Sequence, residues 1–160
     1  MKTADIMTKG VIAATTSTPV SEIARLMVQH HLTGIPVADD SGRLLGLVTD
    51  RDLVVRHARV HFPTYIPLLE SLVYVGNTRH FEQELRKALA TTAGELMGKE
   101  VPTVGPETDI LDVAALMFHK DVNPIPVVDH DRRIVGIISR ADLVKLLVRE
   151  ETPTEQQAEG

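Results

Sequence analysis

The 160-residue chain contains no cysteine, which excludes disulfide bonds, thiolate metal sites and a cysteine nucleophile. It has no tryptophan, and an aromatic content of 3% offers little for stacking single-stranded nucleic acid. The formal net charge is −5, and no run of Lys or Arg is present, which argues against a general affinity for nucleic acid or anionic membrane. These absences favour small molecules and proteins as partners.

Long hydrophobic runs and enzyme motifs are also missing. No apolar stretch approaches the roughly 18 residues of a membrane span, and residues 1–8 lack the apolar core of a signal peptide. There is no Walker loop, dinucleotide glycine motif or nucleophile elbow. His57 and His61 have a spacing compatible with metal ligation, but no acidic third ligand is near. We therefore expect a cytoplasmic protein that is not an enzyme and contains no metal site.

The chain contains an internal repeat, because residues 5–54 match residues 95–144 at 16 of 50 positions without a gap. The matches include Ile35-Pro36-Val37 with Ile125-Pro126-Val127, and Asp52-Leu53-Val54 with Asp142-Leu143-Val144. Chance similarity would give far fewer identities. We interpret the chain as one unit duplicated in tandem.

Each repeat has the hydrophobic pattern of a β-α-β-β-α unit. An apolar stretch at 11–14, and again at 101–104, predicts a first strand. The helix that follows has apolar residues at offsets 0, 3, 4 and 7, which indicates one buried face. Thr18 before Pro19 predicts the N-cap of the first such helix. Two strands joined by a turn, at 35–38 and 44–49 and at 125–128 and 134–139, precede a last helix.

The predicted fold class is α/β, with two pseudo-twofold-related β-α-β-β-α repeats packed through their sheets, because a unit of this size is marginal alone. The predicted domains are repeat 1 at 3–55, a helical insertion at 56–92, repeat 2 at 93–149 and a disordered tail at 150–160. The insertion could extend the core, or serve as a lid or a partner surface.

The most informative residues lie where the last strand of each repeat meets its last helix. Gly46-Leu47-Val48-Thr49-Asp50-Arg51-Asp52 matches Gly136-Ile137-Ile138-Ser139-Arg140-Ala141-Asp142. One interpretation is structural, since a hydroxyl residue followed three positions later by an acid is a helix capping box. The other is functional, since the N–H groups of a helix N-terminus suit phosphate and a carboxylate suits a ribose diol. The glycine that precedes these residues would leave room for a backbone or a ligand to approach.

With these motifs, Thr33-Gly34-Ile35-Pro36-Val37 and Asn123-Pro124-Ile125-Pro126-Val127 make the chain resemble a tandem pair of CBS domains of the stand-alone prokaryotic type. The family takes its name from cystathionine β-synthase. The resemblance implies a regulatory module that binds adenosine-containing ligands such as AMP, ADP, ATP or S-adenosylmethionine. It implies no required cofactor, although a nucleotide could bind with Mg²⁺. It also implies a homodimer of CBS pairs that signals to an effector protein.

The resemblance further implies two composite ligand sites, in which the motif aspartate holds ribose and the hydroxyl residue contacts ribose or phosphate. The arginine beside each motif could pair with phosphate or be a solvated surface residue. One site would comprise Leu47, Thr49, Arg51 and Asp52 with Pro102, Val122, Asn123 and Pro124. The other would comprise Ile137, Ser139, Arg140 and Asp142 with Ile12, Leu32, Thr33, Gly34, Ile35 and Pro36.

The two implied sites are not equivalent. Pro124 replaces Gly34 and removes a backbone N–H that could read adenine, and Pro102 replaces Ile12. We therefore expect tighter binding at the Asp142 site. The alternative is a protein-interaction or dimerisation module with vestigial pockets, in which the two aspartates serve only as helix caps.

Overall fold

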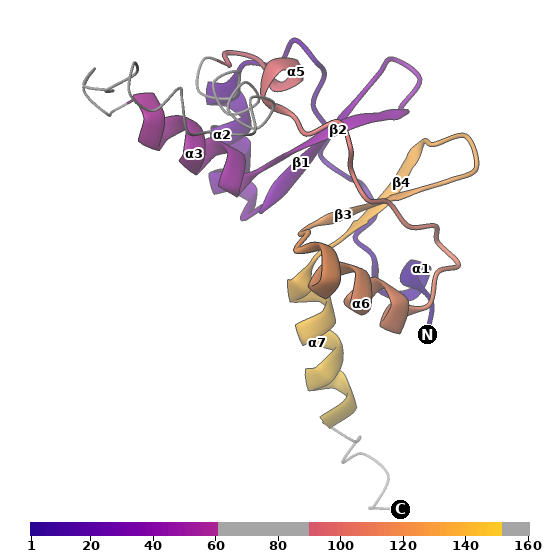
Figure 1. The fold of residues 1–160 in the computed structure, drawn as a ribbon. Coiled ribbons are helices and arrows are strands. Elements are labelled where there is room, and N and C mark those ends of the chain that lie inside the picture. Colours follow the sequence, from indigo (N-terminus) through magenta and orange to yellow (C-terminus); the bar gives the residue numbers. More distant parts are fainter. Residues whose placement is uncertain (61–89, 152–160) are drawn as a thin grey trace, which may run out of the picture. The chain divides into compact units, whose positions relative to one another are not determined.

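The computed structural model describes residues 1–60 and 90–151, and it confirms a mixed α/β fold (Figure 1). In chain order the elements are α1 (Thr3–Ile6), α2 (Val20–His30), β1 (Gly34–Ala38), β2 (Leu44–Thr49), α3 (Asp50–Val60), α5 (Ala93–Leu96), α6 (Ile110–Lys120), β3 (Ile125–Val128), β4 (Ile134–Ile138) and α7 (Arg140–Glu151). β1 pairs with β2, and β3 pairs with β4. Most of the predicted insertion and tail, residues 61–89 and 152–160, lies outside the described residues.

The chain divides into two compact units, and each combines one repeat with a short segment from elsewhere in the sequence. The described part of the Thr49 unit comprises residues 13–39, 45–60 and 90–99, and that of the Ser139 unit comprises residues 1–12, 40–44 and 100–151. The segment that contains α1 therefore packs with the second repeat, and the segment that contains α5 packs with the first. Each unit is described by itself.

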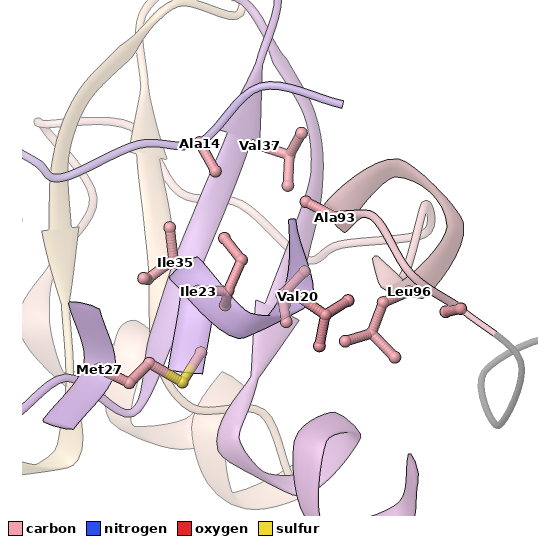
Figure 2. Close-up of a cluster of buried hydrophobic side chains, with 10 residues drawn as sticks. Ala14, Val20, Ile23, Met27, Ile35, Val37, Ala93 and Leu96 are labelled. Atoms are coloured by element: carbon pink, nitrogen blue, oxygen red, sulfur yellow. The ribbon is translucent and has the colours of Figure 1, made fainter. Parts of the chain in front are cut away.

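The core of the Thr49 unit lies between α2, β1 and α5 (Figure 2). Val20, Ile23 and Met27 of α2 are buried, as the predicted apolar face requires. Ile35 and Val37 of β1 are fully buried against them, and Ala93 and Leu96 of α5 complete the cluster. Burying each large aliphatic side chain contributes about 1.5–3 kcal/mol, so α5 is an integral part of this core.

The Ser139 unit has the corresponding core. Ile110, Val113 and Met117 of α6 form the predicted buried face. β3 runs antiparallel to β4, with Ile125 opposite Ile138 and an irregularity between Val127 and Val128. The α1 segment contributes Ile6 and Met7, which are only partly buried. The two predicted strand pairs are thus confirmed to within a residue at each end.

The predicted first strands are wrong in extent. Each is reduced to a single parallel bridge, Ala14 with Val37 and Val104 with Val127. The Ala14 N–H donates to the Pro36 carbonyl and the Ala38 N–H donates to the Ala14 carbonyl, both at 2.9 Å. The next bond of a parallel ladder would need the N–H of Pro36, which proline lacks. The proline therefore ends the pairing.

The predicted N-cap at Thr18 is also wrong. α2 begins at Val20 with Pro19 in the cap position and no side-chain cap. The Thr18 hydroxyl instead accepts the Thr15 N–H at 3.0 Å within the preceding turn. At the equivalent end of α6, Asp109 is a true N-cap whose carboxylate accepts the Leu111 N–H at 3.0 Å.

Candidate functional site

In each unit, the short added segment fixes the strand that leads into the predicted motif. Leu47 of β2 exchanges two backbone hydrogen bonds with Gly98, at 3.0 and 2.9 Å. Ile137 of β4 makes the same exchange with Thr8, at 3.0 and 2.9 Å. The end of the strand, and with it the start of the next helix, is therefore held in the same way in both copies.

Each motif begins with a glycine because atoms of another segment lie where a side chain would be. A Cβ at Gly46 would lie 2.7 Å from the Gly98 carbonyl oxygen and would meet the Met97 side chain. A Cβ at Gly136 would meet the Met7 side chain. The close approach of a backbone predicted at these glycines is thus confirmed at Gly46, whereas at Gly136 the nearest atoms belong to the Met7 side chain.

Thr49 and Asp52 form a hydroxyl–carboxylate clasp at the start of α3. Asp52 Oδ2 accepts the Thr49 N–H at 3.0 Å and the Thr49 hydroxyl at 3.1 Å. The Asp52 N–H faces Thr49 Oγ1 at 3.4 Å. Asp52 is only 8% exposed, so its carboxylate is held in one orientation. The predicted capping box is therefore present, with the hydroxyl bond added to it.

Ser139 and Asp142 form the equivalent clasp at the start of α7. Asp142 Oδ2 accepts both the Ser139 N–H and the Ser139 hydroxyl at 2.8 Å. The second carboxylate oxygen, Oδ1, lies 3.4 Å from Lys145 Nζ. The Asp142 side chain is 11% exposed and that of Lys145 is 69% exposed. Lys145 has no counterpart at the same position of α3, where Val55 stands.

The loop before β1 contacts the start of α3, and the loop before β3 contacts the start of α7. The Asp50 N–H donates to the Thr33 carbonyl at 3.0 Å. The Arg140 N–H donates to Asn123 Oδ1 at 2.9 Å, and the Arg140 guanidinium pairs with Asp121 at 3.0 Å. The structure thus places Thr33 beside one clasp and Asn123 beside the other. The predicted pairing of each motif with adenine-facing residues of the opposite repeat stays a prediction.

Three charged residues near the clasps were missed by the sequence reasoning. Asp50 uses its carboxylate to accept the Arg51 N–H at 2.7 Å. Asp121 and Lys145 form the ion pairs described above. The three-residue spacing between Asp142 and Lys145 on a helix could have identified the second pair. Asp121 gave no such signal, because its contact with Arg140 spans 19 residues.

A hollow of about 540 Å³ in the Thr49 unit lies along α2 and α3. Ala24, Leu53 and His57 are among its lining residues. Aliphatic side chains share its walls with Ser21, Arg56 and Thr91. Of the two histidines considered as metal ligands, His61 lies outside the described residues.

Within residues 1–60 and 90–151, no three His, Asp or Glu side chains converge on a point that could hold a metal ion. Among the described helices, none has the length and apolar character needed to cross a membrane.

The duplicated strand–clasp–helix arrangement agrees with a match to a known family. The model of the CBS domain matches residues 4–58 and 93–149. This protein belongs to the CBS-domain family. The two CBS matches coincide with the two repeats found in the sequence, and each includes one clasp.

Two curated relatives illustrate the range of CBS proteins that the chain resembles. Protein MJ1426 of Methanocaldococcus jannaschii is 28% identical over 151 residues, which cover 90% of this chain and 89% of that protein. The chloroplastic CBS domain-containing protein CBSX1 of Arabidopsis thaliana is 31% identical over 142 residues, which cover 81% of this chain. The match covers 56% of CBSX1, so this chain spans just over half of the plant protein.

A solved structure shows the same fold. The crystal structure of CBSX2 of Arabidopsis thaliana in complex with AMP matches with a TM-score of 0.78 at 25% sequence identity. The match covers 94% of this chain and 99% of the CBSX2 chain.

Proposed function

We propose that this CBS pair is a regulatory module, not an enzyme, that binds adenosine-containing nucleotides at the Thr49 and Ser139 clasps. The observation that carries the proposal is the clasp itself, built twice with the same atoms at the N-terminus of a long helix. The AMP complex of the similar CBSX2 supports the ligand class. A cytoplasmic location is part of the proposal.

The clasp geometry suits a ribose followed by a phosphate. The cap bonds end on Oδ2 of each aspartate, and Oδ1 of Asp142 lies 3.4 Å from the ammonium of Lys145. A carboxylate oriented in this way can accept ribose hydroxyls without losing further rotamer freedom, which favours affinity. The amides at the start of the helix and its positive dipole end attract a 5′-phosphate. For the adenine we retain the residues predicted from sequence, led by Thr33 and Gly34 for the Asp142 site.

A thermal-shift screen against AMP, ADP, ATP and S-adenosylmethionine, with and without Mg²⁺, tests the proposal. A ligand at about 100 times its Kd adds about 2.7 kcal/mol to the free energy of unfolding. For a chain of this size the melting temperature should rise by roughly 5–10 °C. We expect the shift to shrink in Asp142→Asn and in Asp52→Asn, because an amide cannot accept two ribose hydroxyls. Asp112→Asn, an exposed position on α6, is the matched control.

The same screen can reject the proposal. If none of these compounds raises the melting temperature of the unsubstituted protein, the clasps are helix caps only. The module would then act through protein contacts, which is the alternative left open by the sequence.

A second candidate function, homodimerisation, is favoured by an exposed apolar face on the Ser139 unit. Leu111 and Phe118, seven residues apart on α6, are 76% and 82% exposed. Val144, Leu147 and Val148 share one face of α7 and are also exposed. Exposed apolar patches of this kind mark association surfaces. We propose that a second copy of this chain covers the face, and that an effector protein recognises the dimer.

Light scattering coupled to size exclusion tests the dimer. Phe118→Lys should shift the mass from dimer to monomer, because a buried charge disfavours the interface. Val28→Lys is the matched control, since Val28 is the equivalent residue of α2 and is 78% exposed. A dimer that survives Phe118→Lys, or a monomeric unsubstituted protein, would exclude this face as the interface.

A further inference from the structure

We propose that hydrogen peroxide oxidises Met7 and Met97 to methionine sulfoxide, and that this oxidation releases the strand that leads into each clasp. The proposal assigns one modification site to each unit. It goes beyond nucleotide binding and does not depend on the proposed function.

Both methionines lie where a short added segment joins its strand. Met7 follows α1 directly, and Met97 follows α5 directly. The next residue in each segment, Thr8 or Gly98, is the one that exchanges two backbone hydrogen bonds with the strand. A movement of either methionine therefore acts on the bonds that hold β4 or β2.

The sulfur of each methionine packs directly on the glycine of the motif. A Cβ added at Gly136 would collide with Met7 Sδ, and one added at Gly46 would collide with Met97 Sδ. Both methionines also pack against the apolar core of their unit. An oxygen atom added to either sulfur therefore meets the strand backbone, the apolar core or water.

The five methionines of the chain differ in exposure. Met27 and Met117 are 5% and 2% exposed, whereas Met1 is 55% exposed. Met7 and Met97 are partly buried, which gives peroxide a path to them. These two methionines therefore combine access for an oxidant with a contact on a motif strand.

The reaction transfers one oxygen atom and two electrons. The thioether sulfur attacks one oxygen of hydrogen peroxide, so that the O–O bond breaks and an S–O bond forms. The other oxygen leaves as hydroxide and takes the proton of the transferred oxygen, which gives one sulfoxide and one water. The product side chain is polar, whereas the thioether was apolar.

A sulfoxide oxygen needs a hydrogen-bond donor, and the donors beside each sulfur are already used. The Leu47 and Gly98 N–H groups donate to each other's carbonyl groups at 3.0 and 2.9 Å, and those of Ile137 and Thr8 do the same. A buried acceptor without a donor is unfavourable. The oxidised methionine must therefore take one of these N–H groups or leave the core for water, and either change loosens the pairing of segment and strand.

Peroxide treatment of the unsubstituted protein tests the sites. Peptide mass spectrometry gives an oxidation rate for each methionine, and we expect Met7 and Met97 to react faster than Met27 and Met117. The melting temperature should fall by roughly 2–4 °C for each oxidised site. Hydrogen exchange followed by NMR should show loss of protection at the strand amides of Leu47 and Ile137.

Single substitutions assign each effect to one methionine. Met97→Leu and Met7→Leu keep a similar apolar volume but cannot form a sulfoxide. Peroxide should then expose only the Ile137 amide in Met97→Leu and only the Leu47 amide in Met7→Leu. Met1→Leu is the matched control and should respond as the unsubstituted protein does. Methionine sulfoxide reductase should restore the lost protection.

Two results overturn the proposal. One is an oxidation rate at Met7 and Met97 no higher than at the two core methionines. The other is complete oxidation of Met7 and Met97 with both strand amides still protected, which would show that the sulfoxide turns to water without disturbing the strand. Both measurements are made without nucleotide, so neither result bears on the proposed function.

Discussion

The Thr49 and Ser139 units build the same clasp in different surroundings. In both, one aspartate oxygen accepts a backbone N–H and a hydroxyl at the start of a helix. Around this shared geometry, Asp50 and Val55 in one unit correspond to Arg140 and Lys145 in the other. Divergence has therefore spared the bonds that fix the strand–helix junction and has changed the charges beside them.

The two units also differ in the short helical segments, α5 and α1, that each takes from outside its own repeat. Leu96 of α5 is fully buried in the Thr49 unit, whereas its equivalent, Ile6 of α1, is only partly buried in the Ser139 unit. The Thr49 unit therefore depends more strongly on a segment that lies outside its own repeat.

Truncation of Leu96 and Ile6 should give the largest loss of stability. Leu96→Ala should lower the free energy of unfolding by about 3 kcal/mol, because it leaves a cavity in a filled core. Ile6→Ala should cost less, about 1–2 kcal/mol, because water already reaches this side chain. Urea unfolding followed by circular dichroism measures both, and hydrogen exchange shows which unit loses protection. Equal costs would remove the asymmetry between α5 and α1.

The two motif glycines sharpen the comparison further. Gly46→Ala places a methyl against the backbone oxygen of Gly98, which cannot move alone, and should cost about 2–3 kcal/mol. At Gly136 the three atoms nearest to an added methyl all belong to the flexible side chain of Met7, so Gly136→Ala should cost about 1 kcal/mol. Thermal unfolding of both variants gives the difference.

A second substitution separates side-chain from backbone clashes at the glycines. Met7→Ala should largely remove the cost of Gly136→Ala, whereas Met97→Ala should rescue Gly46→Ala only in part. Full rescue at Gly46 would show that the Gly98 carbonyl is not the obstacle.

Substitution of the two clasp aspartates should give the next largest loss of stability. Without ligand, Asp52→Ala and Asp142→Ala should each cost about 1 kcal/mol, the usual loss for a helix N-terminal cap. The Asp142 cost should include a salt-sensitive part, because Lys145 pairs with Asp142 and is screened by added ions. Melting curves at about 0.05 M and 1 M NaCl test this. A cost of Asp142→Ala that does not change with salt would argue against a stabilising Lys145 pair.

Local signals in the sequence were sufficient for much of this structure. The offsets of Val20, Ile23 and Met27 identified a buried helix face, and the spacing of Thr49 and Asp52 identified the cap. Both features depend on residues within two helical turns of each other.

The features that sequence reasoning missed depend on distant contacts. A four-residue helix such as α5 has no periodicity to read, so the packing of Met97 against Gly46 could not be foreseen. The Arg140–Asp121 pair likewise joins residues from separate elements. The strand predicted at residues 11–14 is reduced to one bridge because Pro36 has no N–H to donate. This cause is visible in the sequence, but the apolar pattern alone predicted a longer strand.

The smallest expected effect concerns the helix starts at Pro19 and Asp109. The Leu111 N–H that Asp109 accepts holds the pKa of this carboxyl below its usual value of 3.8. A lowered pKa in the folded state means that the cap stabilises the protein fully above pH 3.8 and loses this effect as the pH falls through the folded value. Asp109→Asn should therefore show a slightly smaller drop in melting temperature between pH 5 and pH 3 than the unsubstituted protein. Pro19→Ala, which removes no titrating group, should leave that drop unchanged. Identical pH profiles for all three proteins would show that the Asp109 cap adds nothing to the stability of α6.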